Sequence, residues 1–233
     1  YGKTDCSSFL SGAEVMKRLK QIFLPVFWLI FLLTVSSCGS ISENSHGESA
    51  GGLENKTEQI DTAVREEAEA LVEELPEYSG EPYTVVADNE PDFSDSELQT
   101  EAYEEYSELD ELGRCGTAKA NIGEELMPTE DRESISEIKP SGWINKEYDD
   151  VDGGYLYNRC HLIGFQLTAE NANEENLITG TRYMNTEGML TFENMVADYI
   201  KETDNHVLYE VTPVFEDDNL VASGVLMEAE SVE

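Results

Sequence analysis

Apolar residues occupy two separate parts of this 233-residue chain, and this distribution limits where a folded core can form. The first part is a short apolar run near the amino end, and the second begins at about residue 80. Between them, residues 39–75 are rich in Ser, Gly and Glu and contain few large apolar side chains. Such a segment cannot bury enough apolar surface to offset the entropy lost on folding. We therefore expect one domain of ordinary size at 81–233, preceded by an acidic flexible tether at 38–80.

The first apolar run has the pattern of an export signal. The apolar run covers residues 22–35 and follows a short basic region that starts at Met16. It is shorter than the ~20 residues that a membrane-spanning helix needs. The small residues that end it precede Cys38 and resemble the bacterial lipobox, in which such a cysteine is lipidated. We interpret 16–37 as a lipoprotein signal peptide, with an uncleaved anchor as the alternative. Either interpretation places the domain outside the cell, anchored by Cys38 to the outer face of the cytoplasmic membrane or secreted.

The region after residue 80 combines patterns of strand and helix. Stretches rich in β-branched or small residues, bounded by turn residues, predict strands over four segments: 83–87, 112–118, 207–214 and 220–227. The last two are joined by a turn at 216–219 and predict a hairpin. Residues 101–112 fit a helix or a strand, and both remain open. Residues 186–203 carry apolar side chains at spacings of three and four, which predicts an amphipathic helix. Together these elements predict an α+β domain with a mostly antiparallel sheet.

One stretch of this domain concentrates polar residues of a catalytic type. Two asparagines nine residues apart and a glutamate eight residues further on follow a four-residue motif that ends in histidine. In chain order these residues are Asn158, Arg159, Cys160, His161, Asn176, Asn185 and Glu193. Hydrolysis of a phosphodiester needs a base, cations that neutralise the phosphate, and help for the departing oxygen. A histidine, an arginine and an amide oxygen that binds a metal ion would supply these parts.

The motif and its surroundings resemble a known family. The segments that carry the resemblance are 112–116, 127–130, 140–143, 157–164 and 176–185. Together they resemble the secreted DNA/RNA non-specific endonucleases of bacteria, which belong to the ββα-metal (His-Me finger) superfamily. The core of that likeness is an Asp-Arg-Gly-His motif followed by an Asn, Asn and Glu array, and it covers about 83–233 of this chain. The resemblance implies a ββα-metal finger whose helix carries a metal ion.

The resemblance also implies a role for each member of the array. His161 would be the general base, and Arg159 would hold the phosphate with its planar guanidinium. Asn185 would bind Mg²⁺ through its amide oxygen, with Mn²⁺ as the other candidate ion and water at the remaining positions. Glu193 would orient metal-bound water, and Asn176 would fix the loop around the histidine. The implied activity is metal-dependent cleavage of DNA, RNA or both without sequence specificity.

Plainer interpretations stand beside several of these roles. Asparagine is common in turns and helix caps, which is an alternative for Asn176. In a chain so rich in glutamate, Glu193 fits the solvated face of an acidic helix almost equally well. Lys139 and Arg182 are further candidates for substrate contact, and a surface role suits them as well.

Two positions of the motif depart from the family pattern. Asn158 stands where the family has aspartate, and Cys160 stands where it has glycine. Glycine tolerates backbone angles that cysteine resists, so the second exchange raises a question about chain geometry. Outside the leader region the exported part holds two cysteines, Cys115 and Cys160. Because an even pair in an oxidising compartment is a disulfide candidate, we hypothesise that Cys115–Cys160 ties the motif to the preceding strand.

The two ends of the chain also carry expectations. Residues 1–15 contain no Met and are interpreted as an upstream, non-coding extension. At the other end, the family usually continues into further strands beyond the position of Glu233. Either the domain is a minimal form or the chain is incomplete.

The charge of the chain argues against binding of nucleic acid. The formal net charge is −36, and 113–233 hold 8 basic and 25 acidic residues, a balance of −17. Affinity for nucleic acid normally comes from Lys and Arg that release counterions. Two functions therefore remain open. One is an outward-facing, lipid-anchored endonuclease that is dependent on a divalent ion. The other is a surface lipoprotein on the same scaffold that has lost catalysis and binds a cationic partner.

Overall fold

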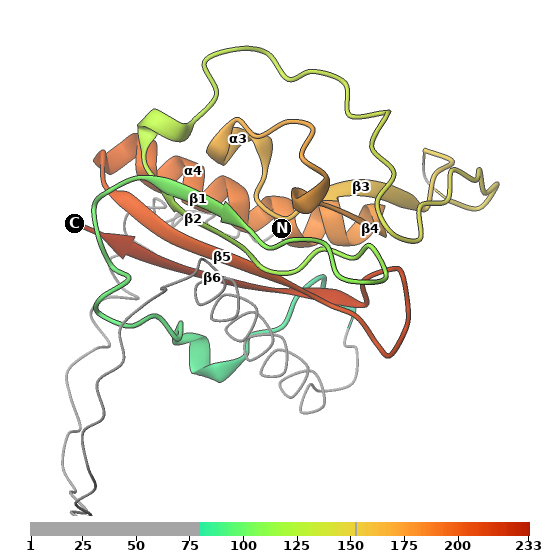
Figure 1. Ribbon diagram of the computed structural model, residues 1–233, viewed down its shortest axis with the longest axis horizontal. Helices are drawn as coiled ribbons and strands as arrows, with labels where there is room; N and C mark the ends of the chain where they lie inside the picture. Colours follow the sequence, from blue (N-terminus) through green and yellow to red (C-terminus); the bar gives the residue numbers. More distant parts are fainter. Residues whose placement is uncertain (1–79, 152) are drawn as a thin grey trace, which may run out of the picture.

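The computed structural model describes residues 80–151 and 153–233 (Figure 1). The expected leader at 16–37, the extension at 1–15, Cys38 and the tether up to residue 79 lie outside the described residues. In chain order the described elements are η1 (Ala87–Asn89), β1 (Tyr103–Tyr106), β2 (Ala118–Ile122), η2 (Glu124–Leu126), β3 (Tyr157–His161), α3 (Phe165–Thr168), η3 (Glu174–Asn176), β4 (Leu177–Thr181), η4 (Met184–Met189), α4 (Leu190–Thr203), β5 (His206–Val214) and β6 (Gly224–Val232). Among the described helices, none is long and apolar enough to cross a bilayer.

The larger of the two described sheets has four strands in the order β1-β2-β5-β6, and each neighbouring pair is antiparallel. Its central strand β5 is buried along nearly its whole length, which fits its run of β-branched and aromatic residues. The nine-residue register between β5 and β6 makes this hairpin the longest pairing of the sheet. The α+β class and the mostly antiparallel sheet expected from the sequence are therefore confirmed.

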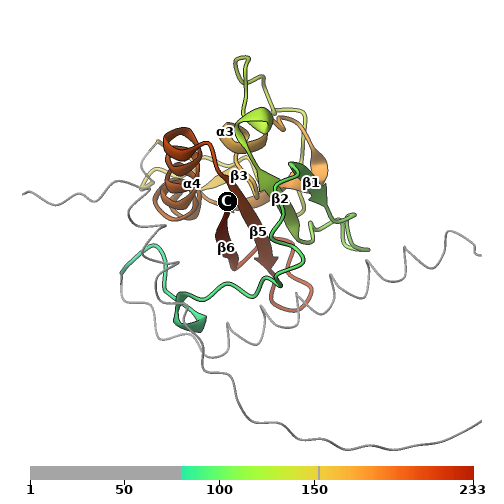
Figure 2. The ribbon, with the colours of Figure 1, turned by 90° about the vertical axis from the view of Figure 1, so that its left-hand side faces the viewer.

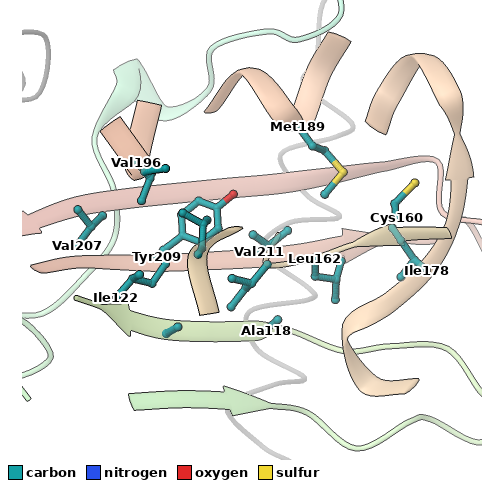
Figure 3. Close-up of a cluster of buried hydrophobic side chains, with 14 of the residues drawn as sticks. Ala118, Ile122, Cys160, Leu162, Ile178, Met189, Val196, Val207, Tyr209 and Val211 are labelled. Atoms are coloured by element: carbon teal, nitrogen blue, oxygen red, sulfur yellow. The ribbon is translucent and has the colours of Figure 1, made fainter. Parts of the chain in front are cut away.

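One face of the sheet is covered by helix α4, helix α3 and the β3–β4 pair, and the segment 80–101 runs along the other side (Figures 1 and 2). Figure 3 shows Met189 and Val196 facing Tyr209 and Val211 of β5, with Leu162 beside them. All five side chains are buried in one hydrophobic cluster. This cluster fixes the position of the long helix relative to the sheet, and with it the residues that the helix carries.

The opposite face of the sheet is held by polar contacts with the chain before β1. Asn121 donates through Nδ2 to the carbonyls of Gln99 and Glu101, at 2.5 and 2.8 Å. Lys119 forms ion pairs with Glu97 and with Glu210 on β5, at 2.5 and 2.9 Å. These contacts bind the entering chain across the middle of the sheet.

Strands β3 and β4 form a separate two-stranded antiparallel sheet in which His161 is opposite Leu177. The chain leaves β3 through the short helix α3 and returns through η3, so the end of β3 lies beside the start of β4. Helix η4, which has the wider π-helical hydrogen-bonding pattern, follows β4 and continues directly into α4. Two strands followed by one helix make the ββα unit that the resemblance implied.

Most of the predicted elements are present, with shifted bounds. The helix expected at 186–203 is confirmed by η4 and α4, and the hairpin is confirmed by β5 and β6. The ambiguous segment 101–112 contains a short strand, and the inner strand expected at 112–118 begins only at Ala118. The strand expected at 83–87 is wrong: this segment is extended but unpaired, and Ala87 begins three successive residues with φ of 47, 54 and 63°. Consecutive left-handed residues end an extended run because they reverse its direction.

Candidate active site

His161 lies at the end of β3 with only 6 % of its surface exposed. Its Nε2 atom is 2.8 Å from the backbone carbonyl of Asn171. A carbonyl can only accept, so Nε2 carries the ring proton and Nδ1 keeps its lone pair. Arg132 donates to this Nδ1 from Nη2 at 3.3 Å. Burial, followed by the charge of Arg132, lowers the pKa of His161 against the opposing effect of the Asn171 carbonyl. The histidine is therefore neutral near pH 7, with a basic nitrogen that faces an arginine.

Asn176 fixes the two residues that follow the histidine. Its Oδ1 accepts from the backbone N–H of Ile163 at 2.9 Å, and its Nδ2 donates to the carbonyl of the same residue at 3.0 Å. Its own backbone carbonyl accepts from Leu162 N–H at 2.9 Å. The side chain is completely buried and touches no solvent. In this structure Asn176 is thus a positioning residue behind His161 rather than a substrate contact.

Glu193 projects from the first turn of α4 and is 8 % exposed. Burial raises the pKa of its carboxyl to about 7, although a hydrogen bond from Gln166 and the charge of Arg132 lower it. The carboxyl group lies against Gly164, where any side chain would collide with it. Glu193 is therefore on the buried face of its helix and not on the solvated one, next to the loop that follows His161.

An open groove of about 390 Å³ runs beside this buried group. Its lining residues are Arg132, Ile135, Trp143, Asn145, Tyr155, Tyr157, Asn158, Arg159 and Asn185. None of these nine described side chains is acidic, although 25 acidic residues occur between 113 and 233. Arg132 both lines the groove and contacts His161, so it connects the groove to the buried histidine.

Arg159 lines the groove, but much of its guanidinium is engaged by the protein itself. Nε donates to the carbonyl of Ile138 at 2.5 Å, and Nη2 donates to the carbonyl of Ser136 at 2.8 Å. The guanidinium also stacks on Trp143, with Cζ 3.8 Å from the ring centroid. Arg159 therefore secures the loop that carries one wall of the groove.

Asn185 lies in η4 and is half-buried at the edge of the groove. Within the described part of the chain no hydrogen bond engages its side-chain amide, so its oxygen is available to a ligand. The described residues contain no group of three or more His, Cys, Asp or Glu suited to holding a metal ion. Lys139 and Arg182 are exposed and do not belong to the lining of this groove.

The expected Cys115–Cys160 disulfide is not present: both cysteines are free and buried. Cys115 donates from Sγ to the carbonyls of Glu174 and Leu177 at 3.4 and 3.3 Å. Cys160 lies in the middle of β3, where its Sγ packs against Gly180 of the neighbouring strand. The motif contains no residue with a positive φ, so the position of Cys160 does not require glycine. The side chain fits because Gly180 leaves space for it.

Sequence reasoning missed Arg132, Trp143 and Asn171, which complete the surroundings of His161 and Arg159. Arg132 lies 29 residues before the histidine, in an irregular acidic segment without a recognisable pattern. The scarcity of basic residues was the usable signal, because the chain has only 14 of them. A backbone carbonyl such as that of Asn171 leaves no signal in the sequence at all.

The structural neighbours of this chain are nucleases. NucA from Streptococcus agalactiae with magnesium ion bound is 23% identical, with a TM-score of 0.54 over 62% of this chain and 70% of that protein. Sda1 nuclease with bound zinc ion is 31% identical, with a TM-score of 0.47 over 55% of this chain and 68% of that protein. No curated protein sequence matches the chain. The sequence pattern of the DNA/RNA non-specific endonucleases matches residues 94–233. This match covers more than half of the chain, which therefore belongs to the DNA/RNA non-specific endonuclease family.

Proposed function

We propose that this protein is a metal-dependent endonuclease that hydrolyses phosphodiester bonds of DNA and RNA without sequence specificity, with His161 as the general base. Family membership supports the class of reaction. The observation that carries the proposal is the geometry of His161: Nε2 is fixed on a carbonyl, and Nδ1 points to an arginine that lines an acid-free groove.

The base step follows from this tautomer. When Arg132 exchanges Nδ1 for a phosphate oxygen, the Nδ1 lone pair is free to accept a proton from water. That water attacks the phosphorus, the bond from phosphorus to the 3′ oxygen breaks, and the departing oxygen takes a proton from solvent water. The lowered pKa keeps the ring neutral and ready to accept that proton at neutral pH. The Asn171 carbonyl then supports the imidazolium that forms, because it already accepts from Nε2. The Asn176 contacts keep the histidine in place during the transfer.

The groove supplies two guanidinium groups with different tasks. Arg132 reaches from the groove to Nδ1, so it is placed to hold a phosphate oxygen beside the base. Arg159 spends two N–H groups on loop carbonyls, so its main contribution is to keep the wall of the groove in position. Because no lining side chain is acidic, a phosphate meets a local positive field in spite of the −17 balance.

The donor set at Asn185 fits a hydrated divalent ion. A single amide oxygen at the edge of an open groove, without a cluster of acidic ligands in the described residues, suits a cation that keeps most of its water. Mg²⁺ is the preferred ion and Mn²⁺ the alternative, in line with the magnesium bound in NucA. When bound, such an ion would polarise the phosphoryl group and stabilise the leaving oxygen. Glu193, buried on the same helix, would orient water from behind.

We further propose that the enzyme acts outside the cell. The signal-like segment 16–37 and the lipobox-like residues before Cys38 support export and lipid anchoring, or release into the medium. External nucleic acid would then be the substrate.

A nicking assay with supercoiled plasmid and Mg²⁺ tests the proposal. We expect His161→Ala to lower the rate by about 10²- to 10⁴-fold, the usual contribution of a general base. His206→Ala is the matched control, since that histidine pairs with Glu125 at 3.0 Å and does not line the groove. EDTA should abolish nicking by the wild type. A wild type that does not nick, or equal nicking by His161→Ala, would favour the non-catalytic surface lipoprotein.

A further inference from the structure

The groove has three aromatic side chains among its nine lining residues: Trp143, Tyr155 and Tyr157. Tyr155 is 39% exposed and is held by a hydrogen bond from its hydroxyl to Glu147 at 2.7 Å. Trp143 is stacked on one side by Arg159, which fixes the plane of the indole ring. Tyr155 and Trp143 are therefore held in place beside an open groove. They do not belong to the buried hydrophobic cluster between the sheet and helix α4.

One of the rings, Tyr157, lies on the same strand as His161. In an extended chain, alternate side chains share a face, so Tyr157, Arg159 and His161 point to one side of β3. At about 3.3 Å per residue, Tyr157 lies roughly 13 Å from His161 along the strand. Tyr155 comes just before this strand and pairs with Glu147 in an isolated bridge. This reach allows a few nucleotides of a strand to extend from the scissile phosphate across the rings.

The balance of charge in the groove also distinguishes between a duplex and a single strand. A duplex carries one charge for every ~1.7 Å of its axis, and proteins that bind it contact many phosphates at once. Here the lining cations are Arg132 and Arg159, and Arg159 is largely engaged by carbonyls of its own chain. The chain as a whole is strongly acidic, with a formal net charge of −36. Binding energy must then come from groups other than phosphate contacts.

From these observations we propose that the groove binds an unpaired strand of nucleic acid, whose bases pack on Tyr155, Tyr157 and Trp143. The enzyme then prefers single-stranded over duplex nucleic acid. This inference rests on the proposed endonuclease function and specifies its substrate. The faces of paired bases are hidden in the duplex, so aromatic platforms contribute only when the strand is unpaired. Stacking needs no base identity, which agrees with cleavage that ignores sequence.

The test compares kcat/KM of the purified full-length protein for one fluorescently labelled oligonucleotide, first single-stranded and then annealed to its complement. We expect at least a tenfold preference for the single strand. Tyr155→Leu removes the ring and keeps an apolar side chain, and it should lower kcat/KM for the single strand by roughly 5- to 100-fold. The kcat/KM for the duplex should change less than about twofold, so the ratio of kcat/KM for the single strand to that for the duplex should fall.

Two variants keep this test decisive. Tyr155→Phe keeps the ring and loses only the hydroxyl contact with Glu147, so it should keep the preference. Tyr83→Leu removes another exposed tyrosine that does not line the groove, and it should change neither rate. Binding of the labelled single strand to His161→Ala, followed by fluorescence anisotropy, should weaken by the same factor when Tyr155→Leu is added.

The possible failures are distinct. Equal kcat/KM on both substrates, or an equal loss on both in Tyr155→Leu, overturns the preference and leaves the endonuclease function intact. Cleavage of neither substrate by the wild type overturns the proposed function itself.

Discussion

His161 is held from behind by buried contacts, whereas the groove in front of it is walled by an irregular segment. Behind the histidine, the Asn171 carbonyl and both amide atoms of Asn176 form a closed set of hydrogen bonds. In front, Arg159 holds the loop at 127–151 through Ser136, Ile138 and Trp143, and Ser141 of this loop donates to the carbonyl of Leu220 at 2.7 Å. The proposed base is thus part of the folded core, while the wall of the groove is an irregular loop in which Arg159 makes several of the contacts.

This difference predicts which residues determine stability and the chemical step, and which determine substrate binding. Changes behind the histidine should alter stability and the chemical step together, because they loosen a buried loop. Changes in the groove should alter substrate binding and leave the fold nearly intact. Three substitutions test this division.

Asn176→Ala should have the largest effect. It leaves the N–H and carbonyl of Ile163 buried without partners, at about 1–3 kcal/mol each. We expect the free energy of unfolding to fall by about 2–5 kcal/mol, and kcat to fall by about 100-fold because His161 loses its fixed position. Denaturant unfolding and initial rates of cleavage measure the two effects.

Asn173→Ala is the control for that variant, since its side chain accepts one hydrogen bond from Glu175 N–H at 2.9 Å in the same connection. It should cost about 1 kcal/mol and leave kcat unchanged. If Asn176→Ala keeps the wild-type kcat, the buried contacts behind His161 do not support the chemical step. The proposed distinction between these contacts and the groove would then be wrong.

Glu193→Gln should change how stability depends on pH. The folded-state pKa is about 7 and lies above the usual value of about 4.3. Between these values the folded protein holds a proton that the unfolded chain has lost, so the free energy of unfolding falls as pH rises from about 4.3 to 7. This decrease, about 2–3 kcal/mol, should be absent in Glu193→Gln when unfolding is measured in EDTA.

Asp198→Asn provides the comparison for Glu193→Gln, because it removes one exposed carboxylate from the same helix. Its stability should follow pH as the wild type does. An unchanged slope in Glu193→Gln would mean that the buried carboxyl is not the group that titrates.

Arg159→Lys should have the smallest effect and the most selective one. Lysine cannot span both carbonyls or stack as a plane on Trp143, so the groove wall loosens while the contacts of His161 remain. We expect KM to rise by about 3- to 10-fold and kcat to stay within about twofold. Steady-state kinetics on a short oligonucleotide separate the two constants.

Arg114→Lys is a close control, because Arg114 also stacks on an aromatic ring, 4.8 Å from the centroid of Phe215, and donates to loop carbonyls away from the groove. It should leave both kinetic constants unchanged. A large fall in kcat for Arg159→Lys would instead assign this arginine a direct part in the chemistry.

The sequence was most informative where contacts are local. The long helix and the hairpin follow from residue spacing within about 30 residues, since spacing on a strand or helix determines which side chains share a face. The ββα unit was implied by the family resemblance alone. The groove does not follow from such patterns. Arg132, Trp143 and Tyr155 come from an irregular segment whose path depends on tertiary contacts, and no periodicity marks them.

The cysteine prediction was wrong for a related reason. Counting cysteines predicted a pair, but strand geometry directs Cys160 toward Gly180 and places Cys115 against Glu174 and Leu177. The space left by Gly180, two residues along β4 from the partner of Cys160, accommodates the cysteine that replaces glycine in the motif. The number of thiols in a sequence does not show which way they point.

These two thiols have a practical consequence. Burial raises the pKa of each to about 12, so the folded protein presents almost no thiolate at either position. Alkylating reagents can then reach Cys115 and Cys160 only when the surrounding core opens. Because Cys115 contacts the carbonyl of Leu177 at the start of β4 and Cys160 lies within β3, the rates at which they are labelled would both report on the opening of the β3–β4 pair. The protein thus carries two internal probes of local unfolding, and no engineered label is needed.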